Sequence, residues 1–162
     1  MNRFTGPEVF MHSMGRGAAV LGIAILTALP AIAGGAWKEA AAKSMVDEGI
    51  RLLEQKGAEE MIRTVNQRKK PFSDGEFYLF VIGPENRIVA HGFDGSRIGL
   101  AASDLYDHEN QPYGQLMVKL ADEKGRWIPY KQFNPLSKRV EPKRSWIKRA
   151  NGYIFGCGVY GE

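Results

Sequence analysis

An apolar stripe on a charged background predicts a long helix in residues 38–67. Apolar side chains recur there at spacings of three and four residues, which places them on one face of an α-helix. The stripe consists of Val46, Ile50, Leu53, Met61 and Val65, with Gly57 in the same row. We expect the flexible Gly57 to bend or divide the helix, and Pro71 to end it, because proline lacks an N–H donor.

Beyond Pro71 the pattern changes to short apolar runs that are typical of strands. Residues 76–83 are rich in aromatic and β-branched side chains, and with residues 87–91 they form a predicted hairpin. Three more strands are expected at 126–132, 143–150 and 153–160. The last two are joined by Asn151-Gly152, a strong hairpin signal because both positions tolerate positive φ.

The order of these elements indicates an α+β fold. Residues 92–110, rich in Gly and Asp, form an expected loop, and residues 113–123 a second, short helix. The simplest closure is a five-stranded antiparallel sheet with the N-terminal helix over one face. The loop-and-helix excursion would then lie over the other face, and a face covered in this way can hold a small ligand.

The uncharged residues 18–33 predict a signal peptide for export. The run AAVLGIAILTALPAIA follows Arg16 and ends in an A-x-A pattern that fits cleavage by signal peptidase. It is short for a membrane span, which needs about 20 apolar residues. We therefore expect residues 1–33 to be removed, with a permanent membrane anchor as the alternative.

The exported protein would consist of one periplasmic domain, residues 34–162. Met11 and Met14 are plausible alternative starts, because either leaves a short basic segment before the apolar run. No second apolar run follows, so we expect no transmitter, kinase or methyl-accepting segment in this chain.

Composition and charge narrow the range of functions. The chain has 162 residues, enough for one domain, with 22 Lys and Arg against 18 Asp and Glu. The basic residues are scattered, so no nucleic-acid partner is expected. The single cysteine, Cys157, cannot form an internal disulfide, and burial in a strand is favoured over a reactive thiol. The histidines lack metal-ligand spacing, so neither metal nor cofactor is expected.

Several short motifs occur in a characteristic order across residues 38–160. The first half contains FSDGEFYLFV, then IVAH ending at His91, then Ile98-Gly99. The second half contains GRWIPY, NP, EPK, SWI and finally GYIFGCGVY, which ends at Tyr160. In their order and spacing these motifs resemble those of single Cache sensor domains.

The resemblance implies a PAS-like sheet backed by a long N-terminal helix, located outside the cytoplasmic membrane. It also implies binding of small metabolites, often short carboxylates, without catalysis. Most members of the family are part of chemoreceptors or sensor kinases, so a membrane receptor or kinase is an expected partner. The resemblance also implies a possible homodimer, with two copies paired through the N-terminal helix. Two positions depart from the family pattern: Gly92 stands where a proline often follows the histidine, and the loop 107–114 is altered.

A buried anionic ligand needs a cation or several aligned donors. Lys143, at a strand start, is the favoured cation, with a solvated edge lysine as the alternative; Arg126 is a weaker choice. His91, at the mouth of the excursion, would donate a ring N–H to a carboxylate and respond to pH, or else bond the loop backbone.

Aromatic residues on the strands complete the predicted ligand site. Tyr and Trp suit a polar ligand in an apolar pocket because each has a polar tip, although an aromatic in a strand is more often part of the core. The candidates are Tyr78, Phe80, Trp127, Tyr130, Trp146 and Tyr160. Gly156 and Gly158 alternate on one face of the last strand, where they either leave room for a ligand or let the helix approach closely.

The leading hypothesis is a periplasmic sensor module that binds a small organic acid and has no output domain of its own. The alternative is a structural or protein-interaction module of the periplasm with no small ligand. An enzyme is not expected, because no nucleophile–base pair is evident. The carboxylates of Asp104 and Asp107 fit neither a glycosidase pair nor a calcium loop.

Overall fold

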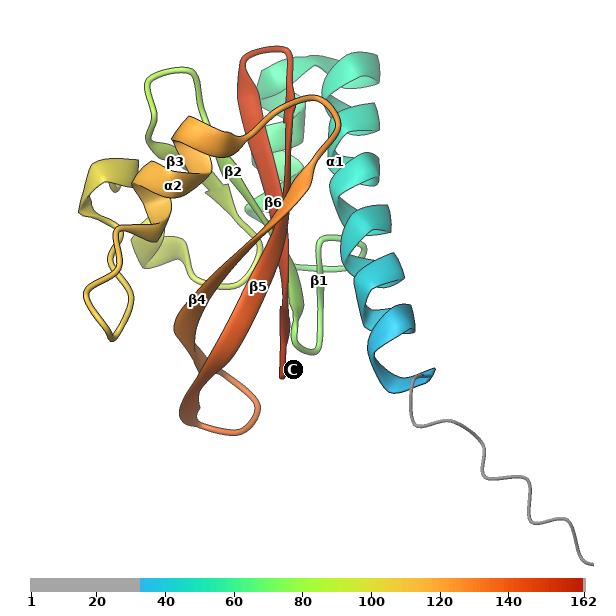
Figure 1. The fold of residues 1–162 in the computed structure, drawn as a ribbon. Coiled ribbons are helices and arrows are strands. Elements are labelled where there is room, and N and C mark those ends of the chain that lie inside the picture. The colour runs from blue at the N-terminus through green and yellow to red at the C-terminus, as the bar shows by residue number, and fades with distance from the viewer. Residues whose placement is uncertain (1–32, 162) are drawn as a thin grey trace, which may run out of the picture. The chain divides into compact units, whose positions relative to one another are not determined.

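The first predicted helix packs along one face of a β-sheet (Figure 1). The computed structural model describes residues 33–161. The elements in chain order are α1 (Ala33–Val65), β1 (Ser73–Asp74), β2 (Phe77–Ile82), β3 (Ile88–His91), η1 (Gly95–Arg97), η2 (Ala102–Asp104), α2 (Tyr113–Leu120), β4 (Arg126–Asn134), β5 (Arg139–Ala150) and β6 (Tyr153–Tyr160). The α+β fold expected from the sequence is confirmed.

Helix α1 is divided where the sequence predicts a bend. Gly57 has φ 81° and ψ 171°, far from the φ of about −63° that a helical residue adopts. The helix begins at Ala33, so the predicted signal peptide, apart from that residue, lies outside the described part of the chain. Across residues 33–161, no helix combines the length and the apolar character that a membrane span requires.

The sheet is antiparallel, with β6 between β2 and β5, and β4 at the edge beyond β5. The free edge of β2 pairs with β3 and with the short β1. The five strands predicted from the sequence are all present. Strand β1 is an additional one, which the sequence did not reveal because two residues, Ser73–Asp74, are too few to show an alternating pattern.

Strands β4 and β5 form a longer hairpin than expected. β4 continues to Asn134 and β5 begins at Arg139, and these two residues are paired. The prediction started β5 only at Lys143, and a proline is uncommon inside a ladder because it lacks an N–H donor. Pro142 instead lies inside the ladder, opposite Lys131.

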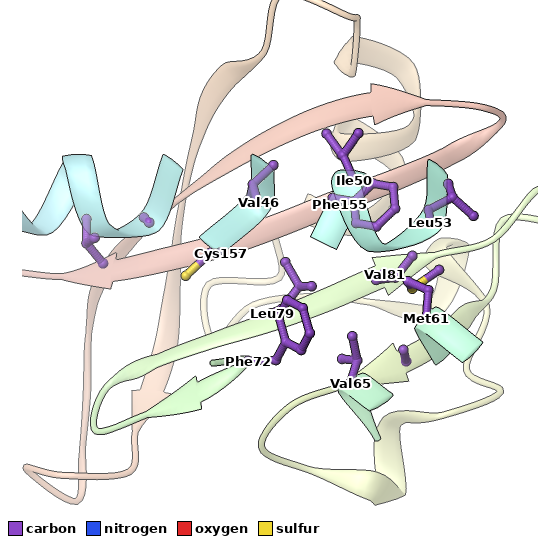
Figure 2. Close-up of a cluster of buried hydrophobic side chains, with 13 residues drawn as sticks. Val46, Ile50, Leu53, Met61, Val65, Phe72, Leu79, Val81, Phe155 and Cys157 are labelled. Atoms are coloured by element: carbon purple, nitrogen blue, oxygen red, sulfur yellow. The ribbon is translucent and has the colours of Figure 1, made fainter. Parts of the chain in front are cut away.

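One hydrophobic cluster joins α1 to the sheet. Figure 2 shows Val46 and Ile50 of α1 meeting Leu79 of β2 and Phe155 of β6, all of them buried. Cys157 belongs to the same cluster and is fully buried, as predicted, and burial raises the pKa of its thiol to about 12. This face of the sheet is closed by α1.

A second cluster lies on the opposite face, against α2 and the excursion. Its sheet residues include Phe80, Ile82 and Ile147, and Met117 of α2 packs on them. Because neighbouring residues of a strand point to opposite faces, each long strand supplies both clusters. Any space for a ligand on this side lies between the sheet and the excursion.

The β5–β6 turn supplies a stability test. Gly152 has φ 82°, a left-handed conformation that costs a residue with a Cβ about 1–2 kcal/mol. Gly152→Ala is therefore expected to lower the free energy of unfolding by about that amount in urea denaturation. Gly35→Ala is the control: Gly35 lies in α1 with open space around it, so alanine should be neutral or stabilising there. Equal losses in both variants would contradict the explanation.

Candidate functional site

A hollow lies on the α2 face of the sheet. Its inner part is a cavity of about 20 Å³, room for one or two waters at about 10–15 Å³ each. This cavity is lined by Tyr78, Phe80, Ile88, His91, Arg97, Leu105, Tyr113, Met117, Tyr130 and Gln132. An outer pocket of about 70 Å³ shares Tyr78, His91, Arg97 and Gln132 with it and adds Phe93, Asp94, Phe133 and Pro135. The two parts together are called the hollow.

Arg97 places a guanidinium at the wall of the hollow. It ends the short turn η1, which Asp94 caps by accepting a hydrogen bond from the Ser96 backbone N–H at 3.0 Å. Arg97 Nη1 donates to the Tyr113 hydroxyl at 3.1 Å, and Nε lies 3.5 Å from Asp94 Oδ2. Within residues 33–161 the other guanidinium N–H groups have no hydrogen-bond partner, so they can bind an anion.

His91 presents a neutral imidazole. Its Nδ1 accepts hydrogen bonds from the backbone N–H of Asp94 at 2.9 Å and of Phe93 at 3.3 Å. This leaves Nε2 to carry the ring proton as a donor. Burial and the nearby Arg97 lower the pKa of His91 to about 3. A pKa of about 3 argues against the expected response of His91 to pH. The bond to the loop backbone, the alternative given for His91, is present, and its role as an N–H donor to a ligand stays a prediction.

Lys143 lies behind the hollow rather than in its wall. The side chain is buried, and Nζ donates to the hydroxyls of Tyr78 and, at 3.2 Å, of Tyr160. It also lies 4.1 Å from the centre of the Tyr78 ring. Lys143 therefore acts on the hollow through Tyr78, whose ring lines both of its parts.

Two stacked tyrosines line the inner cavity of the hollow. The rings of Tyr113 and Tyr130 are nearly parallel, with centres 4.4 Å apart. The hydroxyl of Tyr130 shares a 2.8 Å hydrogen bond with Ser145, and burial raises its pKa well above the usual value. The inner cavity is thus apolar in its walls, with donor groups at one side and no carboxylate among its lining residues.

A sequence profile identifies the family of the chain. The profile described as Single Cache domain 2 matches residues 31–162. The chain belongs to this family. The resemblance that the sequence motifs indicated is thereby confirmed. A search of the curated proteins found no match to the sequence of this Cache domain.

Three solved structures share the fold of this Cache domain. A methyl-accepting chemotaxis protein from Vibrio parahaemolyticus RIMD 2210633 has a TM-score of 0.63 at 13% identity, over 77% of this chain and 89% of that one. A periplasmic sensor domain of a chemotaxis protein has 0.57 at 23%, over 79% and 92%. A Cache chemosensory domain, solved for carboxylic acid recognition, has 0.57 at 16%, over 79% and 90%. Likeness at such identities establishes the fold alone.

The structure brings most of the predicted site residues of the Cache domain onto one face. That group consists of Tyr78, Phe80, His91, Tyr130, Lys143 and Tyr160. Trp127 and Trp146 are not part of it, and the prediction placed them on the wrong face. Their rings pack together 5.5 Å apart on the α1 side, where Lys43 Nζ lies 4.6 Å from the Trp146 ring.

The strand alternation explains the error with the tryptophans. On β5, Lys143 and Ser145 face the hollow, so Trp146 between them must face α1. Arg126, the weaker cation candidate, forms an exposed ion pair with Asp122 and lies outside the hollow. The Asp107 carboxylate accepts backbone N–H bonds from Gln111 and Lys131, which gives it a structural role in the loop.

The glycines of β6 make room for side chains of the domain itself. A Cβ on Gly156 would lie 2.1 Å from Phe80 Cζ, and one on Gly158 would lie 2.0 Å from Lys143 Cε. Both glycines face the hollow side, so they let Phe80 and Lys143 lie flat on the sheet rather than admit α1. They shape the hollow indirectly.

Two polar residues of the hollow were missed in the sequence. Arg97 and Gln132 line both parts of it. Gln132 lies on the same face of β4 as Tyr130, so alternation from that residue could have found it. For Arg97 the available signal was the D-x-S pattern before it, which is typical of a capped turn. Residues 33–161 contain no cluster of His, Cys, Asp or Glu able to hold a metal ion.

The state of His91 can be checked by NMR. We expect its imidazole to stay neutral, with the proton on Nε2, and to show no titration step above pH 5, because the pKa is about 3. Long-range nitrogen–proton correlation spectra report the tautomer, and comparison with His91→Gln assigns the signals. A step near pH 6–7 assigned to His91, or a proton on Nδ1, would contradict the geometry.

Proposed function

We propose that this Cache domain is a sensor module that binds a small monocarboxylate in the hollow. The observation that carries the proposal is the convergence of donors on one apolar cavity. The guanidinium of Arg97, the Nε2–H of His91 and the hydroxyl of Tyr78 belong to residues that line both parts of it. A carboxylate would accept from these groups and supply the negative charge that the inner cavity lacks.

The size of the hollow favours a ligand of two to four carbons. The outer pocket of about 70 Å³ and the inner cavity of about 20 Å³ together offer space for a few heavy atoms. Hydrocarbon of the ligand would lie against Phe80, Met117 and Leu105, and its carboxylate would point towards Arg97. The Cache structure solved for carboxylic acid recognition makes this ligand class a reasonable first choice.

We infer the role in the cell from the family and from the predicted signal peptide. We propose that the domain is exported, works outside the cytoplasmic membrane, and reports its ligand state to a separate membrane receptor or kinase. Binding without catalysis is expected, because the hollow pairs no nucleophile with a base. Pairing of two copies through α1 also stays a prediction; the exposed side of α1 carries ion pairs such as Arg51–Glu48.

A protein-interaction module without a ligand is the second candidate. The small inner cavity favours it, as do the exposed apolar side chains at the β4–β5 turn, among them Leu136 at 62% exposure. In that case the hairpin would be the working surface, and no small acid would stabilise the fold.

A thermal-shift series distinguishes the two candidates. The purified protein is heated with formate, acetate, propionate, butyrate and hexanoate, and with the corresponding amides as controls. A ligand at 100 times its Kd stabilises the folded state by about 2.7 kcal/mol. We expect a rise in Tm with acids of two to four carbons and none with hexanoate or the amides. No shift with any of the acids would refute the carboxylate site.

A further inference from the structure

Lys143 is a buried amine without a counter-ion. It is 3% exposed, and within residues 33–161 no carboxylate forms an ion pair with it. Its hydrogen bonds go to two neutral hydroxyls, those of Tyr78 and Tyr160. A buried ammonium in such surroundings is costly, because nothing replaces the lost hydration with negative charge.

The charged surroundings add to this cost. Burial lowers the pKa of Lys143 to about 7, and the positive charge of Arg97 contributes to the decrease. The titratable groups that face the amine come from five elements: Tyr78 of β2, Tyr160 of β6, Tyr130 of β4, His91 of β3 and Arg97 of η1. Cys157 and Glu76 act in the opposite sense, because they raise the pKa of Lys143. None of the groups in direct contact is an anion at neutral pH.

We propose that a carboxylate enters the hollow together with a proton, which Lys143 takes up from solvent. Above pH 7 the sensor would then respond to the product of anion and proton concentrations, that is, to the undissociated weak acid. This inference rests on the proposed function of the hollow and adds a proton to its ligand.

The hydrogen bonds of the two tyrosines provide the physical connection. The hydroxyl of Tyr160 donates to the Phe133 carbonyl at 2.9 Å, so it can only accept from Lys143 and from the Tyr78 hydroxyl, which lies 3.3 Å away. A neutral Lys143 amine can therefore accept a hydrogen bond from Tyr78 but not from Tyr160. Once the amine is protonated it donates to both hydroxyls, and the Tyr78 proton is no longer held by the amine. That proton can then turn from the Tyr160 hydroxyl, 3.3 Å away, to a carboxylate in the hollow.

The coupling works in both directions. A carboxylate near Tyr78 and Arg97 stabilises the ammonium form of Lys143, so the pKa of Lys143 rises in the complex. By linkage, protonation of Lys143 raises the affinity for the anion by the same factor. Affinity should therefore fall by up to about tenfold per pH unit above pH 7, and should be nearly constant between pH 5 and 6.

Titration calorimetry in buffers of different ionisation enthalpy counts the protons. The purified protein is titrated with propionate in phosphate and in Tris at pH 8, and in two comparable buffers at pH 6. We expect uptake that approaches one proton per ligand at pH 8 and about a tenth of a proton at pH 6, because the free amine is mostly neutral at pH 8 and mostly charged at pH 6. Binding at pH 8 without proton uptake would overturn the coupling and leave the carboxylate site standing. No binding at either pH would overturn both.

Three variants test whether Lys143 is the group that takes up the proton. Lys143→Met keeps the length of the side chain without the amine, and it should bind propionate with no uptake and a flat pH profile. Tyr78→Phe removes the connecting hydroxyl, and should lower uptake to less than about half a proton. Lys131→Met is the matched control: Lys131 lies on the adjacent strand β4 in an exposed pair with Glu109, and its loss should change nothing. Undiminished uptake in Lys143→Met would overturn the assignment.

Discussion

Replacing Arg97 by glutamine is expected to weaken binding of a small carboxylate by about 10- to 100-fold. Hydrogen bonds between charged partners contribute about 1.5–3 kcal/mol, and Arg97 is the permanent cation in the wall of the hollow. Titration calorimetry with propionate at pH 6 measures the effect, because Lys143 is then protonated in both proteins. Arg97→Lys should recover only part of the affinity, since a single ammonium cannot bind a carboxylate through two parallel bonds.

Arg126→Gln is the matched control for this experiment. Arg126 is an arginine of the same domain whose exposed guanidinium pairs with Asp122, away from the hollow. Its loss should leave the affinity unchanged and cost less than about 1 kcal/mol of stability. Equal affinities for the wild type and Arg97→Gln would show that the guanidinium does not touch the ligand.

Lys143→Met is expected to change how the stability of the free protein depends on pH. Between the folded pKa of about 7 and the usual lysine value of 10.5, the unfolded chain binds a proton on Lys143 that the folded protein does not. The free energy of unfolding therefore rises with pH in that window, by about 1.4 kcal/mol per unit. As the pH falls from 7 to 6 the folded state also takes up the proton, and this contribution to the slope fades.

The measurement is urea denaturation of both proteins at pH 6, 7, 8 and 9. Above pH 9 the raised pKa of Cys157 acts in the opposite direction, so the comparison stops there. The wild type should gain about 2–3 kcal/mol relative to Lys143→Met between pH 7 and 9, and less than about 0.5 kcal/mol between pH 6 and 7. Parallel pH profiles of the two proteins would mean that Lys143 titrates normally and that its burial is incomplete.

Periodicity in the sequence predicted the fold well. The apolar row of α1 and the alternating runs of β2 and β6 reflect burial on one or both faces, which the residue order alone reveals. The Asn151-Gly152 turn was predicted because its backbone conformation requires those residues. Strand β1 was missed because two residues carry no period.

The ligand site was less predictable, because it depends on which face each strand turns towards the excursion. Tyr78, His91 and Lys143 were selected on chemistry and do meet, whereas Trp146 was selected on chemistry and points to α1. Arg97 comes from a loop that has no periodic pattern, and only the capped turn η1 places it in the hollow. Contacts between distant segments of this kind cannot be predicted from local sequence.

A crystal structure of the purified protein with propionate tests the carboxylate site most directly. We expect the ligand in the hollow, with its carboxylate oxygens within hydrogen-bonding distance of the Arg97 guanidinium and of Nε2 of His91. A hollow that stays empty or closed at saturating propionate, or a ligand bound only at the outer surface, would contradict this account.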